Sequence, residues 1–182
     1  KLFVKKAVEN GIDIIRIFDA LNDVNNLKVA MEATVNAGAI ASGTISYTTS
    51  PVHTHAKYVE MVKELKEMGA STICIKDMAG IMGPQEAYDM VSAIKDAVPG
   101  MPIDLHTHST TGLAFMTYLK AVEAGVDIID TAISPFSGGT SQPATETLAY
   151  ALRQLGYQVD LNDDCLTAMA DYFKGVRDEF VK

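Results

Sequence analysis

The sequence of 182 residues has little of what indicates a membrane, secreted or nucleic-acid-binding protein. It contains only two cysteines, Cys74 and Cys165, which form neither a disulfide framework nor a metal-type cluster. Its apolar runs are short and broken by charges, which excludes a membrane-spanning helix. The 15 basic residues form no cluster and are outnumbered by 23 acidic ones, which argues against nucleic acid as a partner. We therefore expect a protein of a reducing, cytoplasmic compartment.

A loose repeat of amphipathic stretch, glycine and short apolar run organises the chain. Examples are "VENGIDIIRIFDA", "KEMGASTICIKDMAG" and "VEAGVDIIDTAISPFSGG". The opening "KLFVKKAVENG" reads as the tail of such an amphipathic helix and not as a signal peptide. The glycines that end the amphipathic stretches suit left-handed helix C-caps, and they are Gly11, Gly38, Gly69, Gly100 and Gly125. The alternation predicts βα units and a parallel sheet.

The fold class that fits best is α/β, in the form of a (β/α)8 TIM barrel. Polar residues stand where the apolar runs end, as active-site residues do in barrels, and they are Asp19, Thr48, Lys76, His108 and Ser134. No G-x-G-x-x-G motif or P-loop is present, which disfavours an open nucleotide-binding sheet. About five strands are visible, whereas a complete barrel has eight in ~250 residues. We predict a partial barrel over residues 1–160 and the start of a C-terminal helical extension over residues 161–182.

All four histidines occur in two copies of the tripeptide "HTH". In "IDLHTH" the backbone is a predicted strand, on which His106 and His108 project to the same side and can hold one divalent metal ion. In "SPVHTHAKY" a proline marks a loop that opens a helix, so His53 and His55 should point apart. The alternative for the strand pair is a hydrogen-bonded pair in the barrel core. The alternative for His55 is a solvent-facing residue near a helix start.

Lys76 ends the apolar strand "STICIK", where an ammonium group is costly to bury. Its simplest role is an ion pair with Asp77 or Asp130. A neutral lysine can instead add CO2 and become a carbamate, whose oxygen atoms can bind metal. An unmodified ammonium cannot act as a ligand.

Several motifs in the same order resemble the carboxyltransferase domain of biotin-dependent enzymes. They are "RIFDALNDVNNL", "GTISYTTSPVHT", "CIKDMAG", "LHTHSTTG" and "DTAISPFSGGTSQPATE", and the resemblance extends from about Gly11 to Tyr157. The family includes pyruvate carboxylase, the oxaloacetate decarboxylase α subunit and the oxaloacetate-using subunit of transcarboxylase. The resemblance implies that the chain covers about the fourth to eighth βα units of a TIM barrel.

The resemblance also implies a divalent metal ion, such as Zn, Mn or Co, at the barrel mouth. Its ligands in the family are two histidines, a carbamylated lysine and an aspartate, of which the first three map onto His106, His108 and Lys76. The aspartate has no counterpart in this chain. The family's pyruvate-binding Arg and Gln and its catalytic Thr are also missing, and Thr140 does not correspond to that threonine.

The function implied is carboxyl transfer between oxaloacetate or pyruvate and carboxybiotin, with biotin carried on a separate domain or subunit. The implied partners are a biotin carrier domain and either a biotin carboxylase or membrane decarboxylase subunits. Unpaired sheet edges of a partial barrel also favour a homo-oligomer. Lys76 and Arg16 are the candidate catalytic residues. For Arg16 we favour the alternative of a structural salt bridge with Asp19 or another strand-end carboxylate.

Two rival interpretations stay open at this point. One is a metal-dependent aldol-type lyase or synthase of the same superfamily, such as isopropylmalate synthase or hydroxymethylglutaryl-CoA lyase. These enzymes share the H-x-H strand but lack "KDMAG", which makes Lys76 the discriminating residue. The other is an inactive fragment. The sequence does not specify the metal, the oligomeric state, or whether the parent enzyme is a decarboxylase pump or an ATP-dependent carboxylase.

Overall fold

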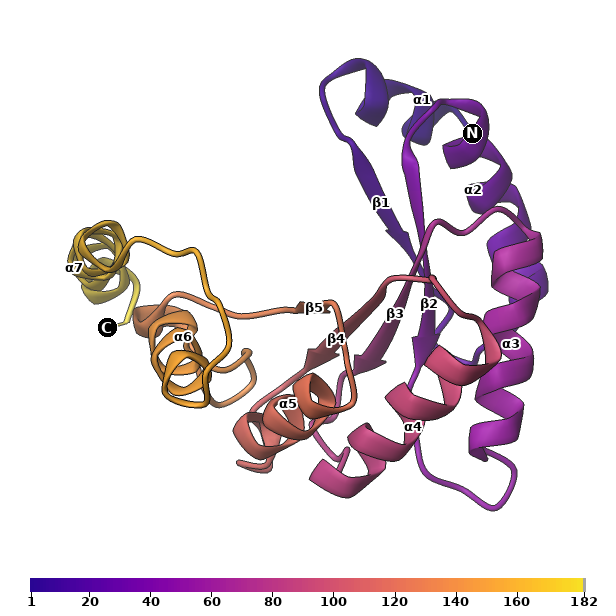
Figure 1. The fold of residues 1–182 in the computed structure, drawn as a ribbon. Coiled ribbons are helices and arrows are strands. Elements are labelled where there is room, and N and C mark those ends of the chain that lie inside the picture. Colours follow the sequence, from indigo (N-terminus) through magenta and orange to yellow (C-terminus); the bar gives the residue numbers. More distant parts are fainter. Residues whose placement is uncertain (182) are drawn as a thin grey trace.

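The computed structural model describes residues 1–181, and Lys182, at the end of the expected helical extension, lies outside them. A single sheet of five parallel strands runs in chain order from β1 to β5 (Figure 1). The strands are β1 (Ile14–Ile17), β2 (Ile40–Ser46), β3 (Thr72–Asp77), β4 (Ile103–Thr107) and β5 (Ile128–Ile129). The helices are α1 (Leu2–Glu9), α2 (Val24–Asn36), α3 (His55–Glu67), α4 (Pro84–Ala97), α5 (Ala114–Glu123), η1 (Ser134–Phe136), α6 (Thr145–Gln154) and α7 (Asp163–Phe180). The predicted βα alternation and parallel sheet are confirmed.

The two faces of the sheet differ in chemistry because side chains alternate along each strand. The outward face carries apolar residues, among them Ile73, Ile75, Ile103 and Leu105, all with no exposed surface. Helices α2 to α5 cover this face, and the opposite face opens into the curve of the sheet (Figure 1). Burying each of these isoleucine and leucine side chains contributes about 1.5–3 kcal/mol. Apolar packing on one face thus holds the strands while the other face is free to carry polar groups.

The inward face is polar, and the strand register lines up its side chains across the sheet. Thr44, Cys74 and Asp104 are consecutive Cα partners, and so are Ser46, Lys76 and His106, one row nearer the carboxyl ends. Most of these residues are buried although several carry hydroxyl or charged groups. Such a face needs hydrogen-bond and ion-pair partners, and these define the site described below.

The five glycines expected at helix C-caps all adopt the left-handed conformation. Their φ angles are +94° at Gly11, +77° at Gly38, +94° at Gly69, +79° at Gly100 and +90° at Gly125. At Gly69 the neighbouring Val35 would also come within 3.0 Å of an added Cβ atom. A residue with a side chain is strained at these positions, so each helix ends where the sequence places its glycine.

The C-terminal part departs from the regular alternation. Strand β5 is short, and η1 and a loop separate it from α6, while α7 stands away from the sheet (Figure 1). Helix α7 lies against η1 through an edge-to-face contact of Phe136 and Phe173, whose ring centroids are 5.7 Å apart. None of the helices within residues 1–181 is both long and apolar enough to cross a membrane.

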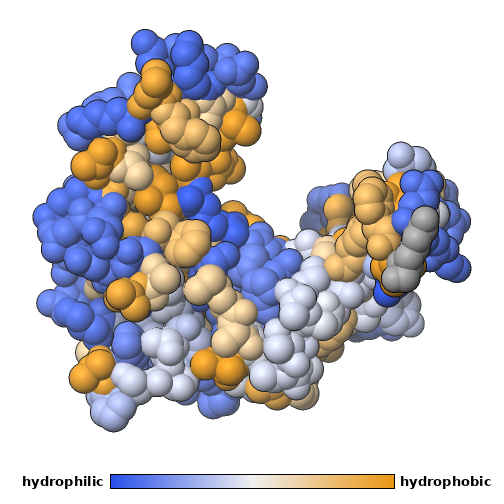
Figure 2. Space-filling view, turned by 180° about the vertical axis from the view of Figure 1, so that it is seen from behind, coloured by the Kyte–Doolittle hydropathy of each residue, from blue (hydrophilic) through white to orange (hydrophobic). Residues whose placement is uncertain are grey.

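The molecule is hollowed on one side, between the N-terminal elements and the arm formed by α6 and α7 (Figure 2). Hydrophobic residues reach the surface in the N-terminal part, including Leu2, Phe3, Ile12, Ile14 and Phe18. The inward, polar face of the sheet lies within this curve.

Candidate metal centre

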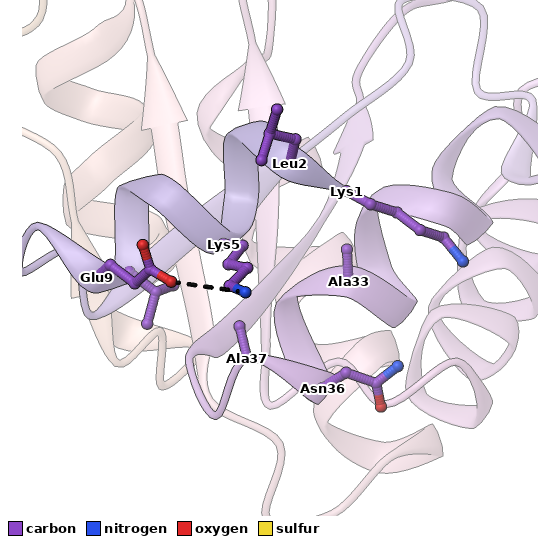
Figure 3. Close-up of a pocket in the computed structure, with 8 residues that line it drawn as sticks. Lys1, Leu2, Lys5, Glu9, Ala33, Asn36 and Ala37 are labelled. Atoms are coloured by element: carbon purple, nitrogen blue, oxygen red, sulfur yellow. Dashed lines mark ion pairs between the residues drawn. The ribbon is translucent and has the colours of Figure 1, made fainter.

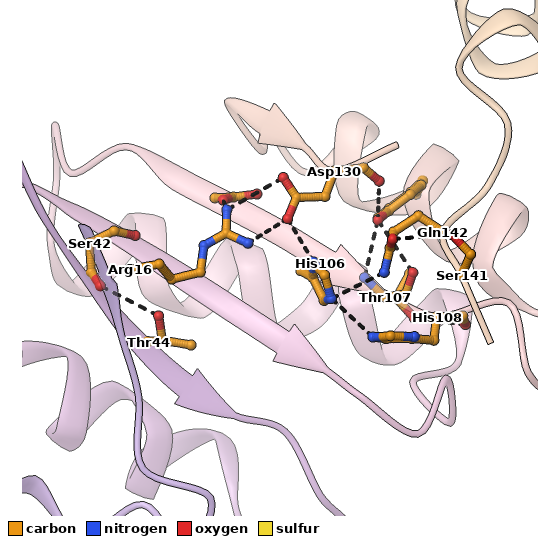
Figure 4. Close-up of polar contacts among 11 residues, drawn as sticks. Arg16, Ser42, Thr44, His106, Thr107, His108, Asp130, Ser141 and Gln142 are labelled. Carbon is orange, nitrogen blue, oxygen red and sulfur yellow. Dashed lines mark hydrogen bonds and ion pairs between the residues drawn. The ribbon is translucent and has the colours of Figure 1, made fainter. Parts of the chain in front are cut away.

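His106 lies on β4 and His108 directly follows it, and the two side chains project together, as the sequence predicts. His106 and His108 project to the same face because they are two residues apart on extended backbone. Their Nε2 atoms lie 3.1 Å apart and their ring centroids 5.0 Å apart (Figure 4). Two imidazole nitrogens that converge on one point provide two of the ligands that a divalent ion needs.

Each imidazole ring is oriented through its other nitrogen. His106 Nδ1 lies 2.6 Å from Asp130 Oδ2, and His108 Nδ1 lies 2.5 Å from the backbone carbonyl oxygen of Thr140. A carboxylate and a carbonyl can only accept, so both Nδ1 atoms carry the proton. In the neutral rings both Nε2 atoms then present lone pairs to each other, which fits a cation shared between them. Partners of this kind fix the tautomer and orientation of metal-binding histidines.

Arg16 reaches from β1 across the inward face of the sheet. Its guanidinium forms an ion pair with Asp130, at 2.5 Å from Nη1 to Oδ2 (Figure 4). It forms a second ion pair with Asp104. The salt bridge favoured from the sequence is present, but Asp19 is not its partner. Asp19 instead accepts hydrogen bonds from backbone amides of the loop after β1. Arg16 thus ties β1 to the two carboxylates on the far side of the sheet.

The two carboxylates of this network differ in electrostatics. Burial raises the pKa of Asp130, but hydrogen bonds from His106 and Arg16 outweigh burial and lower it to about 2. Burial and the charge of Asp130 raise the pKa of Asp104 to about 6, although Arg16 opposes this. Burial lowers the pKa of Arg16, yet the bond with Asp130 and the nearby carboxylates raise it overall. Asp130 and Arg16 are therefore charged at neutral pH.

Lys76 stands beside the histidine pair because it is the Cα partner of His106 in the sheet. Its ammonium lies 5.2 Å from the centroid of the Phe18 ring, a cation–π contact. The prediction that Lys76 pairs with Asp77 or Asp130 is wrong, since no salt bridge within residues 1–181 involves Lys76. Asp130 is occupied by Arg16 and His106, and Asp77 alternates to the other face of the strand.

Asp77 joins the two strand ends that carry the site. Its fully buried carboxylate accepts hydrogen bonds from Thr107 Oγ1 at 2.7 Å and from the backbone amides of Ile81 and Met82. Gly80 in the same loop has a φ of +67°, and a Cβ atom there would overlap the carbonyl oxygen of His108. The "KDMAG" motif therefore packs the loop after β3 directly against the end of β4.

The second histidine pair does not form a site. His53 Nδ1 bonds to Ser50 Oγ at 2.7 Å, whereas His55 Nε2 bonds to Glu86 Oε1 at 2.8 Å. The two rings therefore turn to different partners, as predicted from the loop backbone. His55 is not simply solvent-facing, since it joins the start of α3 to the first turn of α4.

The carboxylate and histidine groups within residues 1–181 do not complete a metal site by themselves, because no three His, Cys, Asp or Glu side chains are grouped to hold an ion. A pocket of about 610 Å³ lies elsewhere, between α1 and α2, where Lys5 pairs with Glu9 (Figure 3). None of the predicted site residues lines it. To hold an ion the histidine pair would need a further ligand, and Lys76 lies beside it in the sheet.

Sequence reasoning missed three groups that shape this centre. Asp104 could have been found, because it is two residues before His106 and so shares the inward face. Asp130 is expected from the sequence only as a partner of Lys76, but it also follows the apolar run "VDII" at a strand end, where site residues lie. Gln142, whose Nε2 lies 3.2 Å from His106 Nε2, has no such signal because its loop approaches β4 only in the folded chain.

These features define a class: part of a parallel α/β barrel with a pair of oriented histidines at the carboxyl end of its sheet. The family described as HMGL-like matches residues 4–172, and the chain belongs to that family.

The sequences and structures most similar to the chain include carboxyltransferases. It is 53% identical over 178 residues to a pyruvate carboxylase subunit of Methanocaldococcus jannaschii, covering 98% of this chain and 31% of that protein. It is 48% identical to the methylmalonyl-CoA carboxyltransferase 5S subunit of Propionibacterium freudenreichii subsp. shermanii, covering 99% and 36%.

The solved carboxyl transferase domain of Rhizobium etli pyruvate carboxylase with pyruvate superimposes with a TM-score of 0.92 at 37% identity, covering 96% of this chain and 30% of that one. The resemblance inferred from the motifs is confirmed, and the five-stranded sheet is part of a TIM barrel. The chain spans about a third of the length of these curated relatives.

Proposed function

We propose that the chain forms the metal-binding part of a biotin-dependent carboxyltransferase, which moves a carboxyl group between oxaloacetate or pyruvate and biotin. The observation that carries the proposal is the oriented pair His106 and His108 beside Lys76. The similarity to the pyruvate carboxylase subunit and to the methylmalonyl-CoA carboxyltransferase subunit supports it. So does the similarity to a Rhizobium etli carboxyl transferase domain solved with pyruvate and biocytin.

The chain's own residues would hold and orient a divalent ion of the Zn, Mn or Co type. When bound, the ion supplies Lewis-acid stabilisation to the enolate that forms as oxaloacetate loses CO2. His106 and His108 present their Nε2 lone pairs, and Asp130 and Thr140 keep both rings in the tautomer that leaves those lone pairs free. Arg16 acts as a positioning residue, because it fixes the carboxylate that orients His106.

Lys76 is proposed to complete the centre as a carbamate. Its neutral amine would add to the carbon of CO2 and release one proton, which gives an anionic oxygen ligand beside His106. Within residues 1–181 no carboxylate holds the ammonium in an ion pair, so no such bond has to be broken before CO2 adds. The cation–π contact with Phe18 is the interaction that would be lost, at about 0.5–1 kcal/mol.

The biotin carrier and the partner subunits of the proposed enzyme lie outside this chain. Biotin would arrive on a separate carrier domain or subunit, charged by a biotin carboxylase or discharged by membrane decarboxylase subunits. We further propose a cytoplasmic location, assembly into a homo-oligomer, and a domain boundary near residue 160, with α7 beginning a helical extension.

The test is metal content together with the intact mass of the protein, kept in bicarbonate at mildly alkaline pH. One equivalent of metal and a carbamate-sized mass increment are expected for the wild type, and both should be lost in Lys76→Ala. The matched control is Lys57→Ala, an ion-paired and exposed lysine, which should change neither. Metal binding that requires the histidines but not Lys76 would instead favour an aldol-type lyase of the same superfamily. Absence of metal from the wild type would refute the metal centre.

A further inference from the structure

The loop between β5 and α6 delivers one more side chain to the histidine pair. Residues 131–144 fold over the end of β4, where Ser109 N donates to Ser141 O at 2.8 Å. The carbonyl oxygen of Gln142 accepts a hydrogen bond from Gly138 N at 2.9 Å. These bonds fix the backbone around Gln142, so the loop aims its partly buried side chain at the site (Figure 4).

The Gln142 side chain contacts the same nitrogen atom, His106 Nε2, that would bind the proposed metal ion. Its Nε2 lies 3.2 Å from His106 Nε2, and its Oε1 lies 3.5 Å from Ser141 Oγ. Because His106 Nδ1 donates to Asp130, the Nε2 atom of the neutral ring accepts and the Gln142 amide donates. The same lone pair is the one that His106 would give to a metal ion. One lone pair cannot serve both, so amide and ion compete for it.

We propose that the Gln142 carboxamide is a metal-dependent arm. In the metal-free chain it occupies the ligand nitrogen of His106, and metal binding frees the amide to donate a hydrogen bond to an oxygen of the bound oxo acid. This inference rests on the proposed function. A carboxamide suits the role because its N–H groups donate to carbonyl and carboxylate oxygens and it adds no charge that would repel the ion. The Gln142 amide adjoins the ligand nitrogen, so it would be within reach of a substrate oxygen bound at that ion.

The substitution Gln142→Met tests the arm because it keeps an unbranched side chain and removes the donor. Removing a hydrogen bond that exists only without metal should tighten metal binding by about two- to tenfold. Removing the donor to the substrate should weaken pyruvate binding by about a similar factor. Co²⁺ titrations of the complete carboxyltransferase polypeptide that contains this chain, followed by visible absorption, give the first value. Titration of the same Co²⁺-loaded protein with pyruvate gives the second.

A metal-dependent role of Gln142 predicts effects of opposite sign on Co²⁺ affinity and on pyruvate affinity. Tighter Co²⁺ with weaker pyruvate supports the proposal, whereas weaker binding of both would make Gln142 a ligand or a support of the loop and would overturn it. Unchanged Co²⁺ affinity would also overturn it. Gln154→Met, at an exposed position on α6, is the matched control and should change neither affinity. Equal Co²⁺ binding by the wild type and His106→Ala would instead refute the metal centre itself, a result that does not involve Gln142.

Discussion

The chain carries the tripeptide His-Thr-His twice, and the two copies have different surroundings. At the carboxyl end of β4, the Nε2 atoms of His106 and His108 lie 3.1 Å apart on one face. At the start of α3, His53 and His55 turn to different partners, a serine and a glutamate. Identical side chains with identical spacing thus form a pair only where the backbone is extended.

A second difference lies in how firmly each pair is held. Asp130 and a backbone carbonyl bind the Nδ1 atoms of the strand pair, and Arg16 in turn holds Asp130. The loop pair has one hydroxyl and one carboxylate, and the side chains of His55 and Glu86 are 37% and 36% exposed. A pre-oriented pair can bind an ion without first ordering its ligands, which the loop pair would have to do.

The contrast between the two histidine pairs would be disproved most clearly if the loop pair, His53 and His55, bound metal. We expect His106→Ala and His108→Ala each to weaken Co²⁺ binding by more than about 100-fold, because a ligand matters more than the outer-shell partners whose loss weakens it ~10–100-fold. The matched variants His53→Ala and His55→Ala should leave the affinity within about twofold of the wild type, since neither ring faces the centre. Isothermal titration of the four variants measures this. Equal losses from both pairs would disprove the distinction.

A second test of the contrast removes the charge of the carboxylate that contacts each histidine pair, Asp130 for the strand pair and Glu86 for the loop pair. Asp130→Asn should weaken Co²⁺ binding by about tenfold, because the amide no longer supplies the negative charge that favours the Nδ1–H tautomer of His106. Glu86→Gln makes the same change beside His55 and should have no effect on the metal. A loss of Co²⁺ affinity in Glu86→Gln, or none in Asp130→Asn, would contradict the assignment of the site to β4.

The same substitution carries a pH signature with a definite sign. The folded-state pKa of Asp130, about 2, lies below its ordinary value of 3.8, so its ionised form stabilises the fold. That contribution is full above about pH 4 and is lost as the pH falls through 2. The free energy of unfolding of Asp130→Asn should therefore be lower than that of the wild type by about 2 kcal/mol at pH 7. Denaturant titrations should show the gap closing towards pH 2, whereas a constant gap would exclude the ionised carboxylate as its cause.

The sequence predicts what depends on local pattern and misses what depends on loop packing. Alternation along "IDLHTH" is sufficient to place His106 and His108 on one face, and the apolar runs and glycines predict the parallel βα order. The same alternation, applied to "KD", shows that Asp77 cannot pair with Lys76 as expected. Its carboxylate faces the other side and closes a loop.

The partners of the histidine pair come from distant segments. Thr140 and Gln142 reach His108 and His106 only because the loop after β5 folds over β4, and no periodicity specifies that approach. Arg16 finds Asp104 and Asp130 only because the sheet curves and brings β1 opposite β4 and β5. Tertiary curvature, which the sequence pattern does not express, therefore determines how the site is held.

The smallest effect we expect belongs to the loop pair. His55 and Glu86 connect α3 to α4, and an exposed pair of this kind contributes only about 0.2–1 kcal/mol. His55→Ala should lower the free energy of unfolding by no more than that, because both side chains of the pair are partly exposed to water. Denaturant titrations of the wild type and the variant measure the difference. A loss above about 2 kcal/mol would mean that His55 supports the helix interface by packing, and the loop pair would then be structural in the same degree as the strand pair.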